Sequence, residues 1–127
     1  MSVSAALMDE LKGLELADDA ATLRLKSRDF FWFSPVLKRQ LDACRADLVV
    51  RPKTREEVLQ FAAIAAKTRT KVTVRGGGTG NYGQAVPLEG GIVLDMGALN
   101  RVLDVQPSIG TFEAGATMLD IDKALAP

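Results

Sequence analysis

One glycine-rich run holds the residues best suited to binding chemistry. It spans Arg75-Gly76-Gly77-Gly78-Thr79-Gly80-Asn81-Tyr82-Gly83 and contains five of the chain's 11 glycines. Successive N–H groups in such a run can form an anion-binding nest, and the missing side chains let the backbone approach phosphate oxygens closely. The hydroxyl of Thr79 offers a further donor, and Arg75 offers a positive charge whose direction the sequence does not fix. The run therefore predicts a cradle for a phosphate or diphosphate group.

Two other interpretations of the run remain open at this level. Gly78-x-Gly80-x-x-Gly83 matches the dinucleotide fingerprint, but that motif needs a helix beginning inside it, and residues 84–91 have the composition of a loop. Asp95 also follows too soon for the acidic residue expected about 20 positions on. The run could instead be a plain turn between strands, although so many glycines cost much backbone entropy to order. A Walker loop is excluded because no Gly-Lys-Ser/Thr follows.

Composition excludes several classes of function. The chain has no histidine and one cysteine, Cys44, so it holds no internal disulfide and no histidine acid–base catalyst. We interpret Cys44 as structural and expect no metal site. The 16 basic residues equal the 16 acidic ones, which gives no electrostatic case for a nucleic-acid partner. No apolar run is long enough for a transmembrane segment, and the first residues lack a signal-peptide pattern, so we expect a cytoplasmic protein. Chemistry must come from a cofactor, from carboxylates or from residues outside this chain.

Residues 1–44 are expected to form an N-terminal helical preface. Leu7, Leu11 and Leu14 recur at near-helical spacing, with Gly13 interrupting the first helix. The aromatic run at 30–33 has two interpretations, the edge of a core or a contact with a partner domain or cofactor. Ser34-Pro35 then predicts the start of a helix, with serine as N-cap and proline at the first position.

The segments after residue 44 alternate between strand and helix patterns. Strands are expected at 48–50, 71–74, 92–94, 102–105 and 111–114, and capping patterns at Thr54/Glu57 and Thr117/Asp120 predict two helices. The first two strands enclose a helix, which indicates a crossover unit. The last two strands, joined across residues 106–110, form an expected hairpin. These elements predict an α+β protein.

Three of these segments, in their order and spacing, resemble the FAD-linked oxidases of the vanillyl-alcohol oxidase / p-cresol methylhydroxylase superfamily. They are Asp47–Val58, Val74–Asp95 with its Gly91-Ile92-Val93-Leu94-Asp95 end, and the stretch from Leu99 to Thr117. The resemblance covers roughly residues 45–126, and it is closest to relatives that act on small 2-hydroxy acids such as lactate or glycolate. It implies that 45–127 is the first subdomain of an FAD-binding domain of the p-cresol methylhydroxylase type, a small mixed sheet with flanking helices.

The resemblance also implies a role for each matching position. Donors to the FAD pyrophosphate would come from the loop, Asn81 and Gly83 would lie beside the flavin, and Pro52 would lie near the adenine. Gly115 and Ala116 would let the backbone approach the cofactor. Some relatives attach FAD through a histidine in this loop, so the absence of histidine implies noncovalent FAD. The pyrophosphate donors would be Gly76, Gly77, Gly78, Thr79 and Gly80, with Arg75 beside them.

Family members continue well beyond the equivalent of Pro127, with a second FAD subdomain and a substrate-binding domain. The catalytic residues are expected there, so this chain would be a fragment, a truncated gene product or one chain of a split enzyme, inactive alone. The reaction implied for the complete enzyme is hydride removal from an alcohol carbon of a small-molecule substrate such as a 2-hydroxy acid. The alternative is a noncatalytic α+β binding or interaction module without flavin.

Overall fold

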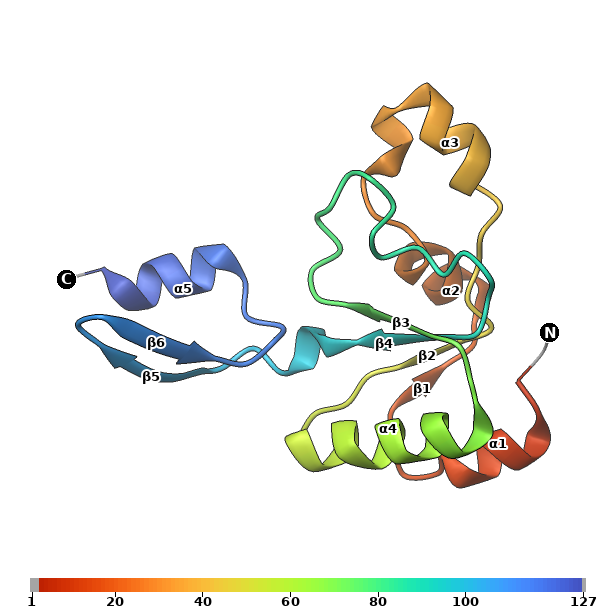
Figure 1. The fold of residues 1–127 in the computed structure, drawn as a ribbon, viewed down its shortest axis with the longest axis horizontal. Helices are drawn as coiled ribbons and strands as arrows, with labels where there is room; N and C mark the ends of the chain where they lie inside the picture. Colours follow the sequence, from red (N-terminus) through yellow and green to blue (C-terminus); the bar gives the residue numbers. More distant parts are fainter. Residues whose placement is uncertain (1–2, 127) are drawn as a thin grey trace.

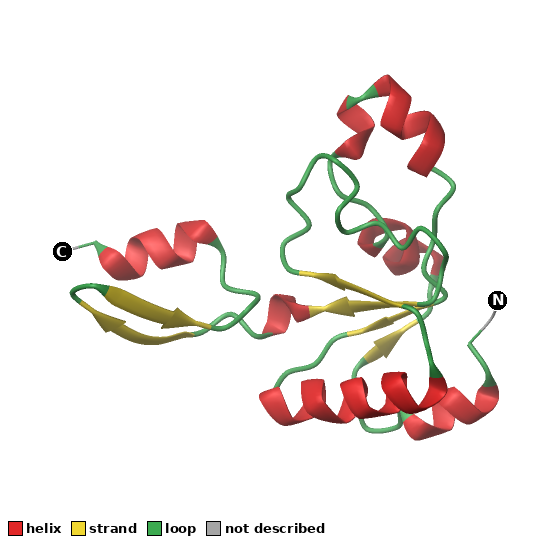
Figure 2. Ribbon diagram, in the orientation of Figure 1, coloured by secondary structure: helices red, strands yellow, loops and turns green. Residues whose placement is uncertain are grey.

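The computed structural model describes residues 3–126, in which helices flank a four-stranded sheet and a separate hairpin stands to one side (Figures 1 and 2). The helices are α1 (Ala5–Glu10), α2 (Ala20–Lys26), α3 (Pro35–Leu41), α4 (Arg55–Thr68) and α5 (Met118–Leu125), with 3-10 turns η1 (Phe31–Phe33) and η2 (Met96–Ala98). The strands are β1 (Leu16–Ala17), β2 (Leu48–Val50), β3 (Val72–Arg75), β4 (Ile92–Asp95), β5 (Val102–Gln106) and β6 (Ile109–Phe112).

The main sheet has the strand order β1-β2-β4-β3. Strands β2, β4 and β3 are parallel, and β1 pairs with β2 in the antiparallel sense. The two central strands, β2 and β4, are buried along their whole length, as expected for parallel strands covered on both faces. The predicted α+β class with a small mixed sheet is confirmed.

The pleat of the sheet divides its side chains between two helical layers. Leu48, Val50, Ile92 and Leu94 join leucines of the N-terminal region and Phe61 of α4 in one core cluster. Val49 and Val93 point to the opposite face, where α2 contributes Leu23. In Figure 1, α1 and α4 lie below the sheet and α2 lies above it, which matches this period-two division.

The capping signals in the sequence are present as hydrogen bonds. The hydroxyl oxygens accept the amide three residues on at each predicted N-cap: Leu37 N to Ser34 at 3.3 Å, Glu57 N to Thr54 at 3.1 Å, and Asp120 N to Thr117 at 3.1 Å. The second half of the expected capping box differs, because the Glu57 carboxylate accepts from Lys53 N at 2.6 Å and not from the N-cap amide.

The structure departs from the expected elements in two places. Residues 1–44 are not only helical, since β1 extends the sheet and the N-terminal leucines complete its core. The expected β5–β6 hairpin forms a second sheet with α5 beside it, away from the first sheet (Figure 1). Strand β6 also begins at Ile109, earlier than expected, because Gln106 pairs with Ile109 and the turn between them is only two residues long.

Candidate cofactor site at the glycine loop

The glycine-rich run lies where the parallel strands end. Strand β3 stops at Arg75, and the chain then passes through residues 76–91 to β4 without forming a helix. Ligands of open parallel sheets bind outside the carboxyl ends of the strands. The dinucleotide-fingerprint interpretation is therefore wrong for this run, because no helix begins between residues 76 and 91 to face a pyrophosphate.

Six consecutive main-chain donors in this loop are free. The amides of residues 76–81 donate to no acceptor within residues 3–126. Strand pairing does not use them either, since the β3–β4 ladder ends at Arg75 and Asp95. The next two amides are engaged: Tyr82 N donates to Gln84 Oε1 at 3.0 Å and Gly83 N to Asp29 Oδ2 at 2.9 Å. The loop thus keeps a row of N–H groups available for an anion, as a backbone nest requires.

Gly76 and Gly77 are glycines that packing within the chain does not demand. A methyl group at Gly76 would lie 3.6 Å from Ala114 O, and one at Gly77 would lie 3.5 Å from Thr79 Cγ2, both ordinary contacts. Neither residue has a positive φ. Because alanine would fit both places in the protein alone, these positions suit a loop that leaves room for a ligand against its backbone.

Gly78 and Gly83 have a different reason to be glycine. Their φ values are +67° and +85°, in the left-handed region that disfavours side chains. A side chain at Gly78 would also collide with the guanidinium of Arg75, and one at Gly83 would come within 2.6 Å of Leu41 Cδ1. These two positions fix the path of the loop whether or not a ligand is bound.

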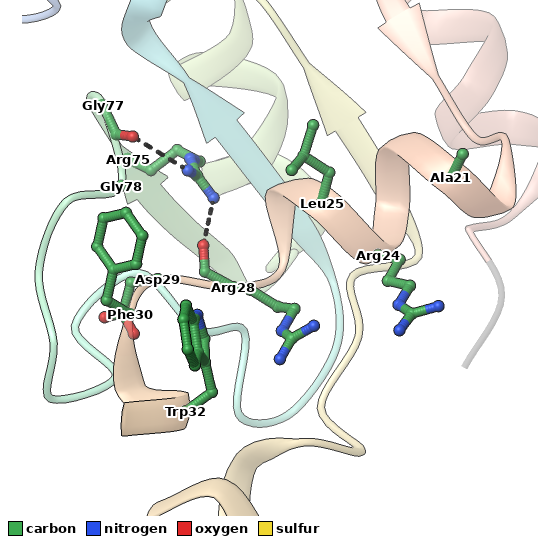
Figure 3. A pocket seen from close by; sticks show the side chains of 10 residues that line it. All are labelled: Ala21, Arg24, Leu25, Arg28, Asp29, Phe30, Trp32, Arg75, Gly77 and Gly78. Carbon is green, nitrogen blue, oxygen red and sulfur yellow. Dashed lines mark hydrogen bonds between the residues drawn. The ribbon is translucent and has the colours of Figure 1, made fainter. Parts of the chain in front are cut away.

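Arg75 points into the protein. It is 7% exposed, and its Nη1 donates to Arg28 O at 2.9 Å (Figure 3). The same Nη1 donates to Lys26 O at 2.6 Å, at the carboxyl end of α2. A cation is favourable there because the helix dipole is negative at that end. Burial lowers the pKa of the Arg75 guanidinium, and the carboxylates of Asp95 and Asp29 oppose that shift. Arg75 therefore ties α2 to the strand before the loop.

The remaining predicted site residues lie around the same edge of the sheet. Pro52 is buried two residues after the end of β2, and β4 lies between that strand and β3. Asn81 is exposed in the loop. Gly115 packs so closely on η2 that any side chain would collide with Met96 O, and its amide donates to Leu99 O at 2.7 Å. The amide of Ala116 is also engaged, donating to Glu113 O at 3.0 Å.

The turn that carries Gly115 lies close to the start of the glycine loop, since a Cβ atom added at Gly76 would be 3.6 Å from Ala114 O. The structure thus brings the start of the loop and residues 114–116 together. The amides of Gly115 and Ala116 both donate within the protein, so a close approach of this backbone to a cofactor would contribute shape and not hydrogen bonds.

Asp29 and Phe30 contact the loop; the aromatic run that includes Phe30 was noted in the sequence, but no signal singled out Asp29. The Asp29 carboxylate is 4% exposed, and it accepts from Phe31 N at 2.8 Å as well as from Gly83 N. Phe30 N donates to Gly80 O at 2.7 Å. Only Phe31 of the aromatic run is buried, so the core interpretation holds for that ring alone.

The exposed aromatic rings border a cavity beside the loop. The cavity has a volume of about 490 Å³ and is bounded by α2, the aromatic run and the loop (Figure 3). Its lining includes Arg24, Arg28, Phe30, Trp32, Gly77 and Gly78. Trp32 stacks on Phe33 with ring centroids 4.0 Å apart.

A buried ion pair fixes α2 against the end of β4. Lys26 Nζ lies 2.6 Å from Asp95 Oδ2, and Asp95 Oδ1 accepts from Gly97 N at 3.1 Å. Asp95 is almost completely buried. Within residues 3–126 there is no cluster of side chains that could hold a metal ion, and no helix long and apolar enough to cross a membrane.

Sequence comparison places this geometry among flavoproteins. Residues 46–127 match the model of a family described as FAD binding domain. Glycolate oxidase subunit GlcD of Escherichia coli is 40% identical over 83 residues, which are 63% of this chain and 16% of that protein. D-lactate dehydrogenase of Archaeoglobus fulgidus is 37% identical over 78 residues, 61% of this chain and 18% of that protein. The chain thus spans less than a fifth of the length of either relative.

Solved structures agree on the fold over nearly the whole chain. Alkyldihydroxyacetonephosphate synthase superposes with a TM-score of 0.82 at 22% identity, covering 98% of this chain and 25% of that one. p-Cresol methylhydroxylase superposes with a TM-score of 0.71 at 14% identity, covering 97% and 25%. The likeness includes the N-terminal residues that the family model leaves out. The family model matches more than half of the sequence, so the chain belongs to the FAD binding domain family, as the resemblance predicted.

Proposed function

We propose that the free amides of residues 76–81 bind the pyrophosphate of FAD. The observation that carries this proposal is the row of unpartnered donors in a loop without a helix. A diphosphate supplies charged acceptors, and hydrogen bonds to charged groups are roughly twice as strong as neutral ones. Fixed main-chain dipoles also explain how a chain with zero formal charge can hold an anionic cofactor.

We assign the remaining predicted residues to supporting roles. Gly76 and Gly77 keep space for the phosphates, Gly78 and Gly83 set the path of the loop, and the turn at 114–116 borders its start. Pro52 is proposed to lie toward the adenine and Asn81 toward the flavin. Arg75 acts through the loop, since its donors are directed to carbonyl groups of the protein.

The complete protein is proposed to oxidise a small 2-hydroxy acid. Support comes from the names of its relatives, which include glycolate oxidase, D-lactate dehydrogenase and D-2-hydroxyglutarate dehydrogenase. When bound, FAD accepts the hydride removed from the alcohol carbon. The residues described here hold and orient the cofactor. Catalytic side chains that contact the substrate are proposed to lie outside this chain.

The ligand series FAD, ADP and FMN tests the pyrophosphate assignment. FAD and ADP share a diphosphate, whereas FMN carries a single phosphate on the flavin. We expect FAD to bind with a Kd of about 100 μM or tighter and to raise the Tm by mass action. ADP should compete with FAD, and FMN should compete poorly. If FMN competed as well as ADP, the diphosphate would not be the group that the loop recognises, and the pyrophosphate assignment would fail.

A noncatalytic module without flavin makes the opposite prediction. In that case millimolar FAD would leave both the flavin fluorescence and the Tm unchanged. A longer gene product, if the reading frame continues beyond Pro127, should then be titrated in the same way. We also propose that FAD is bound without a covalent link, because the chain has no histidine. Acid precipitation of the loaded protein should leave all of the flavin in the supernatant.

A further inference from the structure

The turn at residues 26–31 is hydrogen-bonded to the glycine loop and to Arg75, the residue before it. Asp29 Oδ2 accepts from Gly83 N at 2.9 Å, and Phe30 N donates to Gly80 O at 2.7 Å. On the other side of the same turn, Arg75 donates to Lys26 O and Arg28 O. The turn is therefore bonded to the residue before the loop and to two residues near its end.

These hydrogen bonds are the main polar contacts between the glycine loop, residues 76–83, and the rest of the protein. Apart from the adjoining Arg75, the hydrogen bonds that residues 76–83 make with other elements in residues 3–126 all go to Asp29 and Phe30. The loop has no strand or helix ladder of its own. Its shape, and hence the direction of the amides at 76–81, depends on this attachment.

The charge of Asp29 makes its position informative. A buried carboxylate beside an anion-binding loop opposes a diphosphate electrostatically, so direct attraction cannot explain it. Both oxygens instead accept main-chain amides, Phe31 N at 2.8 Å and Gly83 N. A carboxylate is the side chain that can accept both at once without bringing a donor against either amide.

We propose that Asp29 is a positioning residue that sets the glycine loop in the conformation that binds the FAD pyrophosphate. The inference rests on the proposed function of the loop. It adds a residue outside the matched family segment, which begins at residue 46. Asp29 does not touch the cofactor in this proposal, and its effect passes through Gly83.

Asp29→Asn separates positioning from charge because the two predict opposite signs. The variant removes one negative charge, which by Coulomb attraction alone would tighten FAD binding. It also places an amide NH₂ against one of two main-chain N–H groups, which loosens the loop. Positioning predicts binding at least tenfold weaker than in the unaltered chain. Asp18→Asn is the matched control, since Asp18 is an exposed acid before the amino end of α2, whereas Arg75 and the loop meet the carboxyl end of that helix; its removal should leave the Kd within about twofold. Equal or tighter binding by Asp29→Asn would overturn the proposal.

Amide hydrogen exchange without FAD tests the positioning role independently of the proposed function. In the unaltered chain the Gly83 amide should be protected and the amides at 76–81 should exchange almost freely. In Asp29→Asn the exchange at Gly83 should be at least tenfold faster, while amides in β4 keep their protection. Should the variant fail to fold, the unaltered chain still decides, because an unprotected Gly83 amide contradicts the proposal. If that chain showed this exchange pattern but did not bind FAD, the proposed cofactor would be refuted, whereas the hydrogen bond between Asp29 and the loop would stand.

Discussion

Gly77→Ala is the substitution that best separates an effect on FAD binding from an effect on protein stability. The added methyl would lie 3.5 Å from Thr79 Cγ2 and meet nothing closer outside its chain neighbours, and the residue has no positive φ. Replacing a glycine by alanine at a compatible position stabilises a protein by about 0.4–1 kcal/mol, through the unfolded state. We therefore expect an equal or slightly higher Tm.

FAD binding should change in the opposite direction. The methyl group occupies space beside the free amides, so the phosphate must withdraw from at least one of them. A hydrogen bond to a charged group contributes about 1.5–3 kcal/mol. At about 1.4 kcal/mol per tenfold change, the Kd should rise roughly 10- to 150-fold. Gly76→Ala, with its nearest contact at 3.6 Å, should behave in the same way.

The assay pairs a flavin-fluorescence titration with thermal unfolding of the same samples. Ser108→Ala, at the exposed hairpin turn, is the control and should alter neither measurement. A larger side chain at Gly78 would not discriminate, because it collides with Arg75 and requires a positive φ, so folding and binding would fail together. An unchanged Kd in both the Gly76 and Gly77 variants would refute the location of the pyrophosphate.

Three further predictions concern stability. Asp95→Asn should lower the free energy of unfolding in urea by about 1–3 kcal/mol, because it breaks the ion pair with Lys26. This is less than the roughly 3–5 kcal/mol expected on breaking a fully buried pair, since the Lys26 side chain is 30% exposed. The side chain and amide of Arg101 hold the pKa of Glu113 below its ordinary 4.5, so its contribution is complete above that pH and is lost as the pH falls through the lowered pKa. Glu113→Gln should remove this part of the acid dependence, seen as a shallower decline of the Tm below pH 4.5. Ile109→Ser should change the free energy of unfolding by no more than about 0.5 kcal/mol, because this side chain is 65% exposed; a larger loss would show that the hairpin buries it.

Local signals in the sequence predicted the elements well, because the forces that decide them act within a few residues. The cap at Thr54 depends only on a hydroxyl and an amide three positions away. The buried strand at 48–50 follows from a short run of apolar residues, and it has those bounds in the structure. The hairpin was less accurate, since the pairing of Gln106 with Ile109, and not the composition of 106–110, sets the length of the turn.

Contacts between distant segments could not be predicted in this way. The bond from Gly83 to Asp29 joins residues 54 positions apart, and nothing in the spacing of either segment indicates the other. Strand β1 is a similar case, because two residues in extended conformation carry too weak a pattern to identify, and their pairing with β2 decides their structure. The free amides could be inferred because a run of glycines leaves the backbone accessible. Asp29, the residue proposed to position them, could not be inferred in this way.

Arg75 shows why the face of a strand must be known before a charge can be assigned to a site. Its place beside the glycines suggested a phosphate contact, but side chains alternate along β3, so Arg75 lies on the same face as Thr73 and opposite to Val74. Its register partner is Asp95, which pairs with Lys26 of α2. That face is therefore the one that α2 covers, and the guanidinium meets the carbonyl groups at the end of that helix. The alternation is visible in the sequence, but the helix that covers each face is not, and that unknown alone decides whether this arginine contacts the ligand or the protein.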